Sequence, residues 1–457
     1  MLLFAPCPRG LEALLADEIT AMGAAAVRIS PGGVAFDGDA AMVCQVNLRS
    51  RLASRVLRQV GAGRCRDEDE LGRVARGVPW EQFMTSRQTL RVDTTAVRSP
   101  LRSLNFANLR VKDAVVDRLR QTRGDRPSID TRRPDVRVFA FLQEQQATLY
   151  LDTSGESLFK RGWRREREDK GLAPLKENLA AGLLMLAGWT PERPLLDPYC
   201  GSGTLLIEAA QMALGIAPGL SRAFGFERLR DHDPAQWAQI RGEAIRQAQQ
   251  AGPTLAARLS ITGIDIDPAA IEQARRNIER AGVGGAGIRL AVGDAARVSP
   301  AQPGPGVIVT NPPYGERIAA HQDGQPAPEE RNDASDETHR QAMAAFGRGL
   351  KERFGGWQVN VLSSDRELPR QLGIRESRKT LLYNGALECR LFRFDVFDRA
   401  TREAHDREHQ ARHDRMREAG AARSDPAPAA AGKPSAAAPA DAAQAPLRPP
   451  RGAPSPD

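Results

Sequence analysis

The feature that most constrains the fold is a series of short apolar segments, each ending in a polar side chain. Leu195 and Leu196 form the first segment and lead into Asp197, while the second, "SITGIDID", ends at Asp265 and Asp267. Short apolar runs bounded by turn signals are typical of strands buried in a parallel sheet, and helical stretches separate these runs. The pattern predicts an α/β fold.

A turn of small residues follows the first predicted strand. It contains Gly201 and Gly203, and a helix is expected from about Thr204. Glycine has no Cβ, so such a turn lets the backbone approach a bound ligand. The dinucleotide fingerprint needs Gly or Ala three places after the second glycine, where this chain has Leu206. The turn therefore fits a ligand other than a nicotinamide or flavin.

Two carboxylates at strand ends suit a nucleoside. Asp265 can accept hydrogen bonds from two ribose hydroxyls. Asp294, at the end of "IRLAVGD", can meet an adenine amino group or simply form a turn. Asp267 stands directly before Pro268 and is predicted to be the N-cap of a helix.

The most informative motif follows the strand "GVIVT". It consists of Asn311, Pro312, Pro313 and Tyr314. The Asn311 side-chain oxygen and the Pro312 carbonyl can both accept hydrogen bonds from one exocyclic amine, and the prolines hold the backbone in place. Tyr314 can stack on a base, which stabilises binding by about 1–3 kcal/mol. The alternative is an ordinary Asn-Pro turn.

The sequence offers no metal cluster or covalent nucleophile beside this motif. The 5 cysteines are odd in number and widely spaced, so we expect reduced thiols. His405, His409 and His413 fall in a charged arm and fit solvated surface better than a metal site. Cys200 lacks a neighbouring base and is predicted to be a packing residue.

Charge and hydropathy narrow the class further. The formal net charge of +8 favours an acidic partner such as nucleic acid, although abundant Arg, Ala, Gly and Pro also fit a compositional bias. No window approaches the roughly eighteen apolar residues of a membrane span, and Arg9 and Glu12 follow the apolar start too closely for a signal peptide. We expect a cytoplasmic protein that contacts no membrane.

The amino-terminal third mixes helices and strands. An apolar stripe from Leu11 to Met22 predicts a helix, and "TLRVDTT" and "ATLYLDTS" alternate like half-buried strands. A second helix, from about Asn105 to Thr122, carries an apolar stripe that should face a sheet. Basic residues gather around it, and they fit either phosphate contacts or a solvated surface; they are Arg98, Arg102, Arg110, Lys112, Arg118, Arg120, Arg123, Arg126, Arg132 and Arg133.

Taken together, these segments resemble a known family. "DPYCGSGTLLIEAA", "GIDIDPAAIEQARRN", the Gly293–Asp294 pair and "NPPYGER" are similar to successive motifs of class I S-adenosylmethionine-dependent methyltransferases that modify amino nitrogens. Upstream, "LYLDTSGESLFKRGWR" and "APLKENLAAGLL" are similar to THUMP-containing RNA guanine-N2 methyltransferases, specifically the amino-terminal half of the bifunctional large-subunit (23S) ribosomal RNA methyltransferase. The resemblance runs from "FAPCPRGLEALLADE" to about Asp398.

The resemblance implies three domains. They are an α+β ferredoxin-like segment at residues 1–50, a THUMP RNA-binding domain at 51–155, and a Rossmann-like methyltransferase domain with a seven-stranded sheet at 156–398. Residues 399–457 are expected to form a charged arm and a disordered Ala/Pro-rich tail, because large apolar side chains are scarce there. The polar segment 320–338 resembles an inserted lid or a loop, and disorder is the favoured interpretation.

The resemblance also implies a cofactor, S-adenosylmethionine, and a reaction. The guanine N2 would attack the sulfonium methyl in line, and alignment of the reactants could supply about 7–11 kcal/mol, so no strong base is required. The second catalytic unit of the bifunctional relatives is absent, so one modification of ribosomal RNA is expected. The matching motifs imply roles for single residues. The methionine part of the cofactor would be bordered by Asp197, Gly201 and Gly203, its ribose by Asp265 and its adenine by Asp294. Residues expected near the cofactor as well are Ala173, Pro174 and Leu175, and those expected to hold the guanine are Asn311, Pro312, Pro313 and Tyr314.

Other functions remain open from the sequence. A transfer-RNA guanine-N2 methyltransferase would share the architecture, and a DNA adenine-N6 methyltransferase would share the Asn-Pro-Pro-Tyr chemistry. A THUMP RNA-binding protein with an idle catalytic domain is a non-enzymatic alternative, against which the intact Asp265 and Asn311 argue. A nucleotide-binding oxidoreductase is disfavoured by Leu206.

Overall fold

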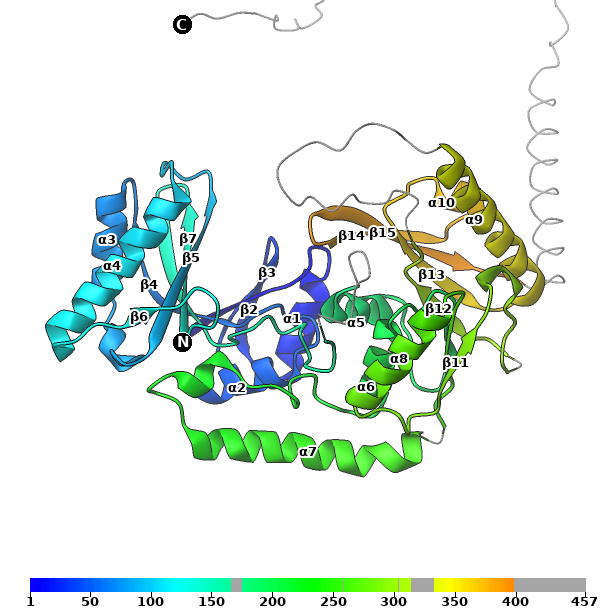
Figure 1. Cartoon of the computed structure of the whole chain (residues 1–457), viewed down its shortest axis with the longest axis horizontal. Coiled ribbons are helices and arrows are strands. Elements are labelled where there is room, and N and C mark those ends of the chain that lie inside the picture. Colours follow the sequence, from blue (N-terminus) through cyan, green and yellow to red (C-terminus); the bar gives the residue numbers. More distant parts are fainter. Residues whose placement is uncertain (166–174, 257, 303, 314–332, 398–457) are drawn as a thin grey trace, which may run out of the picture. The chain divides into compact units, whose positions relative to one another are not determined.

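Two sheets organise the part of the chain that the structure describes (Figure 1). The computed structural model describes residues 1–165, 175–256, 258–302, 304–313 and 333–397. The arm and tail predicted for residues 399–457 lie outside these ranges. None of the described helices combines the length and hydropathy needed to cross a membrane.

The first sheet has eight strands among the described residues, in the order β2-β3-β1-β4-β8-β7-β5-β6. β5 pairs in parallel with β6 and β7, and the other pairs are antiparallel. Because β4 pairs with both β1 and β8, the sheet continues across the domain boundary predicted at residues 50 and 51. Its strands are β1 (Leu2–Pro6), β2 (Ala25–Ser30), β3 (Gly33–Asp37), β4 (Leu57–Arg64), β5 (Thr89–Val97), β6 (Ser128–Ile129), β7 (Val136–Gln143) and β8 (Gln146–Asp152).

The helices beside this sheet follow the predicted apolar stripes. They are α1 (Glu12–Ala21), α2 (Ala40–Arg49), α3 (Glu68–Gly77) and α4 (Leu104–Arg123), with a short 3-10 helix at Trp80–Gln82. On α4 the stripe of Val111, Val115 and Leu119 is fully buried, as predicted. The Ser103 hydroxyl accepts a hydrogen bond from the Phe106 amide and so caps the amino end of α4.

The second sheet has seven described strands in the order β11-β10-β9-β12-β13-β15-β14, which confirms the predicted class. β15 is antiparallel to both β13 and β14, and the other pairs are parallel. The strands are β9 (Leu195–Asp197), β10 (Ile261–Asp265), β11 (Ile288–Val292), β12 (Val307–Thr310), β13 (Gln358–Ser363), β14 (Arg378–Asn384) and β15 (Leu387–Asp395). The helices are α5 (Glu177–Leu186), α6 (Thr204–Ala213), α7 (Pro234–Ala256), α8 (Pro268–Arg280), α9 (Asp333–Arg353) and α10 (Leu368–Leu372), with 3-10 helices at Gly225–Arg228 and Ala295–Arg297.

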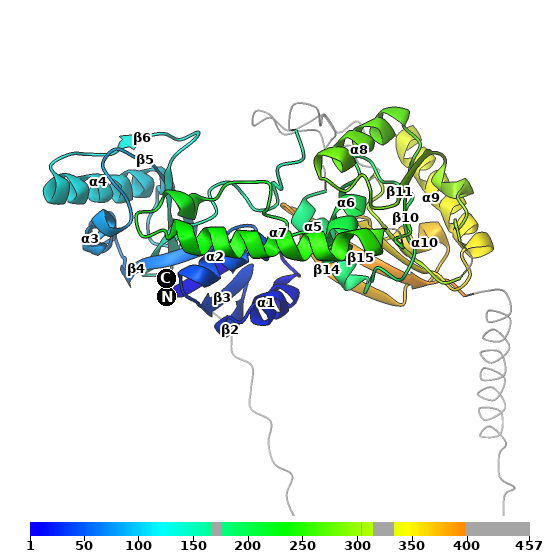
Figure 2. The same ribbon diagram turned by 90° about the horizontal axis from the view of Figure 1, so that it is seen from below.

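Two helices of the second part of the chain need separate description. The long helix α7 runs beside α2, as both views show (Figures 1 and 2), and Arg49 donates a 2.8 Å hydrogen bond to Gln247 on it. The loop predicted at 320–338 is wrong over its last residues, since 333–338 belong to α9. Buried Met343 and Phe346 anchor that helix in the core, and this favours its extension toward the amino end. The rest of the predicted loop lies outside the described residues.

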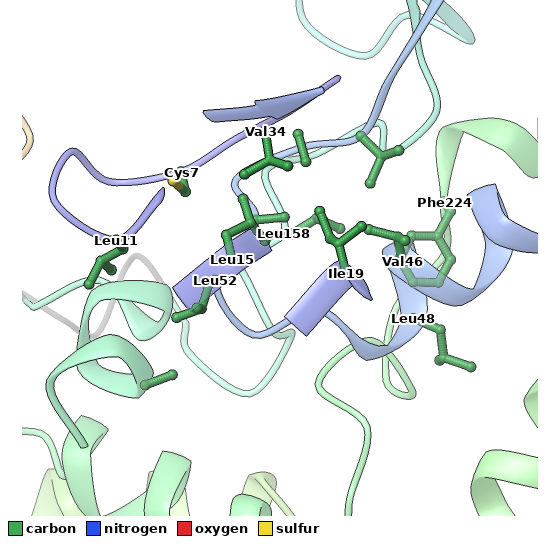
Figure 3. Packing of buried hydrophobic residues seen from close by; sticks show 14 of the residues in the cluster. Cys7, Leu11, Leu15, Ile19, Val34, Val46, Leu48, Leu52, Leu158 and Phe224 are labelled. Carbon is green, nitrogen blue, oxygen red and sulfur yellow. The ribbon is translucent and has the colours of Figure 1, made fainter. Parts of the chain in front are cut away.

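The two sheets share one apolar core. Side chains of α1, such as Leu15, lie with Leu52, Leu158 and Phe224 in a single cluster (Figure 3). A Cβ added to Gly182 on α5 would come within 2.5 Å of Leu11 Cδ1, so only glycine allows this close approach. All five cysteines are buried, and none of them forms a disulfide.

A buried group of charges also joins the two parts of the chain. Glu208, on α6, has no exposed surface and accepts hydrogen bonds from Arg161 Nε at 3.1 Å and Arg51 Nη1 at 3.4 Å. Arg161 in turn donates to the Arg51 carbonyl at 2.7 Å. Buried charges need such partners because no water is present to solvate them.

Candidate active site

The carboxyl ends of the parallel strands place the predicted polar residues at one edge of the second sheet. Asp197 is the last residue of β9, Asp265 the last of β10, and Asn311 directly follows β12. The strand order reverses at β9, which lies between β10 and β12. In open α/β sheets ligands bind in the crevice at such a reversal.

The glycine turn after β9 is held against the end of β10. Gly201 N donates a 2.9 Å hydrogen bond to Asp265 Oδ2, and Cys200 N donates to the Ile264 carbonyl at 2.9 Å. Gly201 and Gly203 have φ values of +50° and +83°, in the left-handed region that favours glycine.

The two glycines face different surroundings. A Cβ on Gly203 would lie 3.2 Å from Ala274 Cβ, so this glycine lets the turn pack on α8. A Cβ on Gly201 would meet no heavy atom within 4 Å. The Gly201 side of the turn is therefore open space that a ligand can occupy.

Asp197 is a buried carboxylate held by two donors. Its side chain accepts hydrogen bonds from Thr310 Oγ1 at 2.7 Å and from Tyr199 N at 3.2 Å. Burial raises the pKa of Asp197 to about 7, because desolvation outweighs the two hydrogen bonds, and the nearby Asp265 adds to the rise. The group therefore titrates near neutral pH.

Sequence reasoning overlooked Thr310. Its position offered the signal: a hydroxyl residue ends the buried strand β12, directly before Asn311, and β12 is the neighbour of β9. A hydroxyl there can reach the carboxylate that ends the adjacent strand.

Asp265 and Asp294 keep capacity for a ligand beside their structural bonds. Asp265 uses Oδ2 for Gly201 N and Oδ1 for Asp267 N at 3.0 Å, yet each carboxylate oxygen has two lone pairs. Asp294 accepts from Ala296 N at 2.8 Å and so caps a 3-10 helix, in line with the turn interpretation. Asp267 accepts from Ala269 N at 2.8 Å, which confirms it as the N-cap of α8.

Two exposed apolar side chains lie beside these carboxylates and were not singled out from the sequence. Ile266 is 73% exposed directly after Asp265, and Val292 is 54% exposed two residues before Asp294. Apolar side chains exposed at this edge of the sheet can contact a flat apolar surface such as a base. The placement of Ile266 between two aspartates was the available signal.

Arg164 connects the segment before α5 to the glycine turn. Its Nη2 donates to Thr204 Oγ1 at 2.6 Å and to the Leu175 carbonyl at 3.4 Å. Its Nε lies 3.1 Å from Glu177 Oε1. Leu175 is therefore buried close to the start of α6, and its predicted place beside the cofactor stays a prediction. Ala173 and Pro174 lie outside the described residues.

The residues after β12 are described as far as Pro313. Val307 to Thr310 are wholly buried, Asn311 is partly exposed, Pro312 is buried and Pro313 is exposed. Tyr314 lies outside the described residues. The amide of Asn311 thus emerges from the core at the edge where Asp197 ends β9.

Cys200 has no nucleophilic character in this setting. Its side chain is buried, and burial together with Asp197 and Asp265 raises the pKa of the thiol. The thiol therefore stays protonated. It also packs closely against Gly263, because a Cβ added to that glycine would lie 3.1 Å from Cys200 Sγ. These contacts fit the predicted packing role.

Part of the basic surface predicted around α4 is already neutralised. Among the described residues, salt bridges join Arg110 to Asp69, Lys112 to Asp113, Arg118 to Glu81 and Arg120 to Asp117. Exposed Phe106 and Leu109 lie on the same helix.

Comparisons with known families match three successive regions. The model described as "RMKL-like, methyltransferase domain" matches residues 164–393, the RlmL ferredoxin-like domain matches residues 2–57, and the THUMP domain matches residues 65–152. The methyltransferase match contains every described residue assigned above to the site.

Individual proteins show the same similarity. The ribosomal RNA large subunit methyltransferase K/L of Syntrophotalea carbinolica is 43% identical over 87% of this chain and 54% of that protein. The chain therefore spans about half the length of the curated relatives that it matches. Among solved structures, SMU.472, a methyltransferase complexed with SAH, has a TM-score of 0.75 and 30% identity over 86% of this chain and 98% of its own. An N6-adenine-specific DNA methylase, so described by prediction, from Listeria monocytogenes has a TM-score of 0.74 and 32% identity over 86% of this chain and 96% of its own.

Proposed function

The chain belongs to the RMKL-like methyltransferase family, and from this premise we propose that it transfers a methyl group from S-adenosylmethionine to the exocyclic N2 amine of a guanine in large-subunit ribosomal RNA. The ribosomal RNA substrate is supported by the name of the Syntrophotalea relative, and the SAH complex of SMU.472 supports the cofactor. The guanine N2 target follows from the motif resemblance.

The residues at the edge of the sheet fit the cofactor. The sulfonium of S-adenosylmethionine supplies an electrophilic methyl group. The open side of Gly201 leaves room for a ligand, and the spare lone pairs of Asp265 can accept from ribose hydroxyls. Asp197 can ionise beside an amino group, since a nearby cation lowers the pKa of a carboxyl. Ile266 offers apolar contact to adenine.

Asn311 and Pro312 are proposed to hold the target amine through their oxygen atoms. The single observation that carries this proposal is the Thr310–Asp197 hydrogen bond. Thr310 directly precedes Asn311, and Asp197 ends the strand that leads into the glycine turn, so the bond links the two segments. Two segments proposed for different reactants thereby share one fixed edge. Such alignment can supply about 7–11 kcal/mol without a strong base.

The test is a transfer assay with three kinds of nucleic acid. The full chain and methyl-labelled S-adenosylmethionine are incubated with large-subunit ribosomal RNA, transfer RNA or DNA, and the products are digested to nucleosides for mass spectrometry. Labelled N2-methylguanosine from ribosomal RNA alone is expected. Label confined to transfer RNA would assign the alternative RNA substrate, and labelled N6-methyladenine in DNA would assign the activity in the name of the Listeria relative.

A further inference from the structure

A hollow lies where the first segment of the chain meets the methyltransferase domain. It has a volume of about 200 Å³. Its lining residues include Arg9 and Ser54 as well as Lys176, Asn178 and Asn384. The first two residues fall in the ferredoxin-like match and the others in the methyltransferase match. Ligand sites occur preferentially at such domain junctions.

The hollow opens at the same edge of the second sheet as the candidate active site. β14 and β13 are both antiparallel to β15, so β14 runs in the direction of β13, β12 and β9. Asn384 ends β14 and therefore lies at the carboxyl edge.

The start of α5 lies at this edge too. The helix ends near the amino end of β13, because Gln358 donates a 2.6 Å hydrogen bond to the Ala187 carbonyl. Its ten residues span about 15 Å, which carries Lys176 toward the opposite edge. Arg164 donates hydrogen bonds to the Leu175 carbonyl and to the Thr204 hydroxyl. Leu175 precedes Lys176 and Thr204 follows the glycine turn, so Arg164 links the residue next to Lys176 with the end of that turn.

Two cations give the hollow a positive charge. The Arg9 guanidinium lies 5.4 Å from the centre of the Tyr383 ring, and Lys176 Nζ lies 5.1 Å from that of Phe159. These contacts orient the cations without neutralising them. Within the described ranges neither cation has a salt bridge to a carboxylate.

The nearest carboxylates on the same elements are engaged elsewhere. Glu12 accepts hydrogen bonds from Gly10 N at 2.7 Å and Gly32 N at 3.1 Å. Glu177 is buried and pairs with Arg164. The charge in the hollow therefore suits an anionic ligand such as a phosphodiester.

Asn178 joins the two parts of the chain that line the hollow. It is fully buried, and its Nδ2 donates to the Leu52 carbonyl at 3.2 Å and to Ser54 Oγ at 3.1 Å. These bonds hold the start of α5 against the amino-terminal segment and so fix the position of the neighbouring Lys176.

The backbone of RNA supplies such an anion, because each of its phosphodiesters carries one negative charge. Cys7 also lines the hollow. Burial, together with the nearby Glu12 and Glu18, raises the pKa of its thiol to about 12, so the thiol itself adds no negative charge.

We infer that this hollow binds a phosphodiester of the substrate RNA outside the target base, with the phosphate against Arg9 and Lys176. The inference rests on the proposed function in one respect, namely that the substrate is RNA.

Binding of RNA, measured without methyl transfer, tests the phosphate contacts. Fluorescence anisotropy follows binding of the full chain to a single-stranded oligoribonucleotide of about ten nucleotides over a range of salt concentrations. Arg9→Ala and Lys176→Ala should each reduce the log-log salt slope by about 0.7 and weaken binding about fivefold at 0.1 M salt. The matched control is Arg28→Ala on β2, an exposed position in the same segment, which should change neither quantity.

The outcomes separate this inference from the proposed function. Unchanged salt slopes in both cationic variants, with a wild-type chain that methylates RNA, would overturn the subsite alone. Reduced slopes in a chain that transfers no methyl to any RNA would support the subsite and overturn the proposed function. A wild-type chain that binds no RNA would overturn both.

Discussion

The hydroxyl of Thr310 donates a 2.7 Å hydrogen bond to the buried carboxylate of Asp197 and so joins the ends of neighbouring parallel strands. Asp197 leads into the glycine turn, and Thr310 leads into Asn311. A contact between two side chains inside the sheet therefore fixes the relative position of the two segments proposed to hold the reactants.

Thr310→Val tests this contact, because it keeps the shape of the side chain and removes only the donor. We expect the free energy of unfolding to fall by about 1.5–3 kcal/mol, the usual range for a hydrogen bond to a charged group. Urea denaturation above pH 8 measures it. Thr94→Val is the matched control, since the buried Thr94 hydroxyl has no partner among the described residues and its loss should cost little. Equal losses in the two variants would contradict the assigned bond.

The raised pKa of Asp197 predicts a pH-dependent stability. The folded chain binds a proton at Asp197 up to about pH 7, whereas the unfolded chain releases it near pH 3.8, the ordinary pKa of an aspartate. Folding thus takes up a proton between these values, and Asp197 lowers the stability progressively as pH rises from about 4 to 7.

Asp197→Asn removes this dependence. We subtract the free energy of unfolding of the wild type from that of the variant. This difference should increase by up to about 4 kcal/mol as the pH rises from 4 to 7, because each unit of pKa shift corresponds to about 1.36 kcal/mol. Urea denaturation of the ligand-free chain at several pH values measures the difference. A difference that is constant from pH 4 to pH 8 would show that Asp197 is not the titrating group.

Gly201→Ala should separate ligand binding from folding. Gly201 has φ +50°, and a left-handed alanine costs about 1–2 kcal/mol of stability. Gly215→Ala is a matched control, because Gly215 has φ +65° and a Cβ there would also meet no atom within 4 Å. Both variants should lose similar stability, but only Gly201→Ala should weaken S-adenosylmethionine binding in calorimetry. Equal affinities in the two variants would remove the turn from the cofactor site.

Asn311→Ala should lower the rate of methyl transfer more than the affinity for RNA. Removal of one aligned polar group from an active site typically costs about a hundredfold to a thousandfold in rate. Single-turnover transfer and equilibrium RNA binding give the two numbers. We would abandon the assigned role if the variant transferred methyl groups at the wild-type rate.

The strand ends could be predicted from the sequence because their signals are local. Buried apolar runs, Gly201 and Gly203 in the turn, and Asp267 before Pro268 each act within a few residues, and the structure has the corresponding strands, turn and helix cap. The proposed roles of these residues toward a cofactor remain predictions.

Contacts between distant residues could not be predicted in this way. Thr310 and Asp197 are 113 positions apart, and Arg164 and Thr204 are 40 apart. Their pairing depends on strand order and on how α5 and α6 pack, which no spacing in the sequence encodes. The same holds for Asn178, whose unpaired oxygen is apparent only once Leu52 and Ser54 are seen to occupy its amide nitrogen.

The charges around Glu208 bear on how such a chain can be recombined. A chimera that kept α6 but took its amino-terminal region from an unrelated protein would lose Arg51, and Glu208 would retain one guanidinium of its two. A buried ion that loses a partner typically destabilises a protein by about 3–5 kcal/mol. An amino-terminal region from another protein is thus tolerated only if it places a cationic side chain where Arg51 meets Glu208.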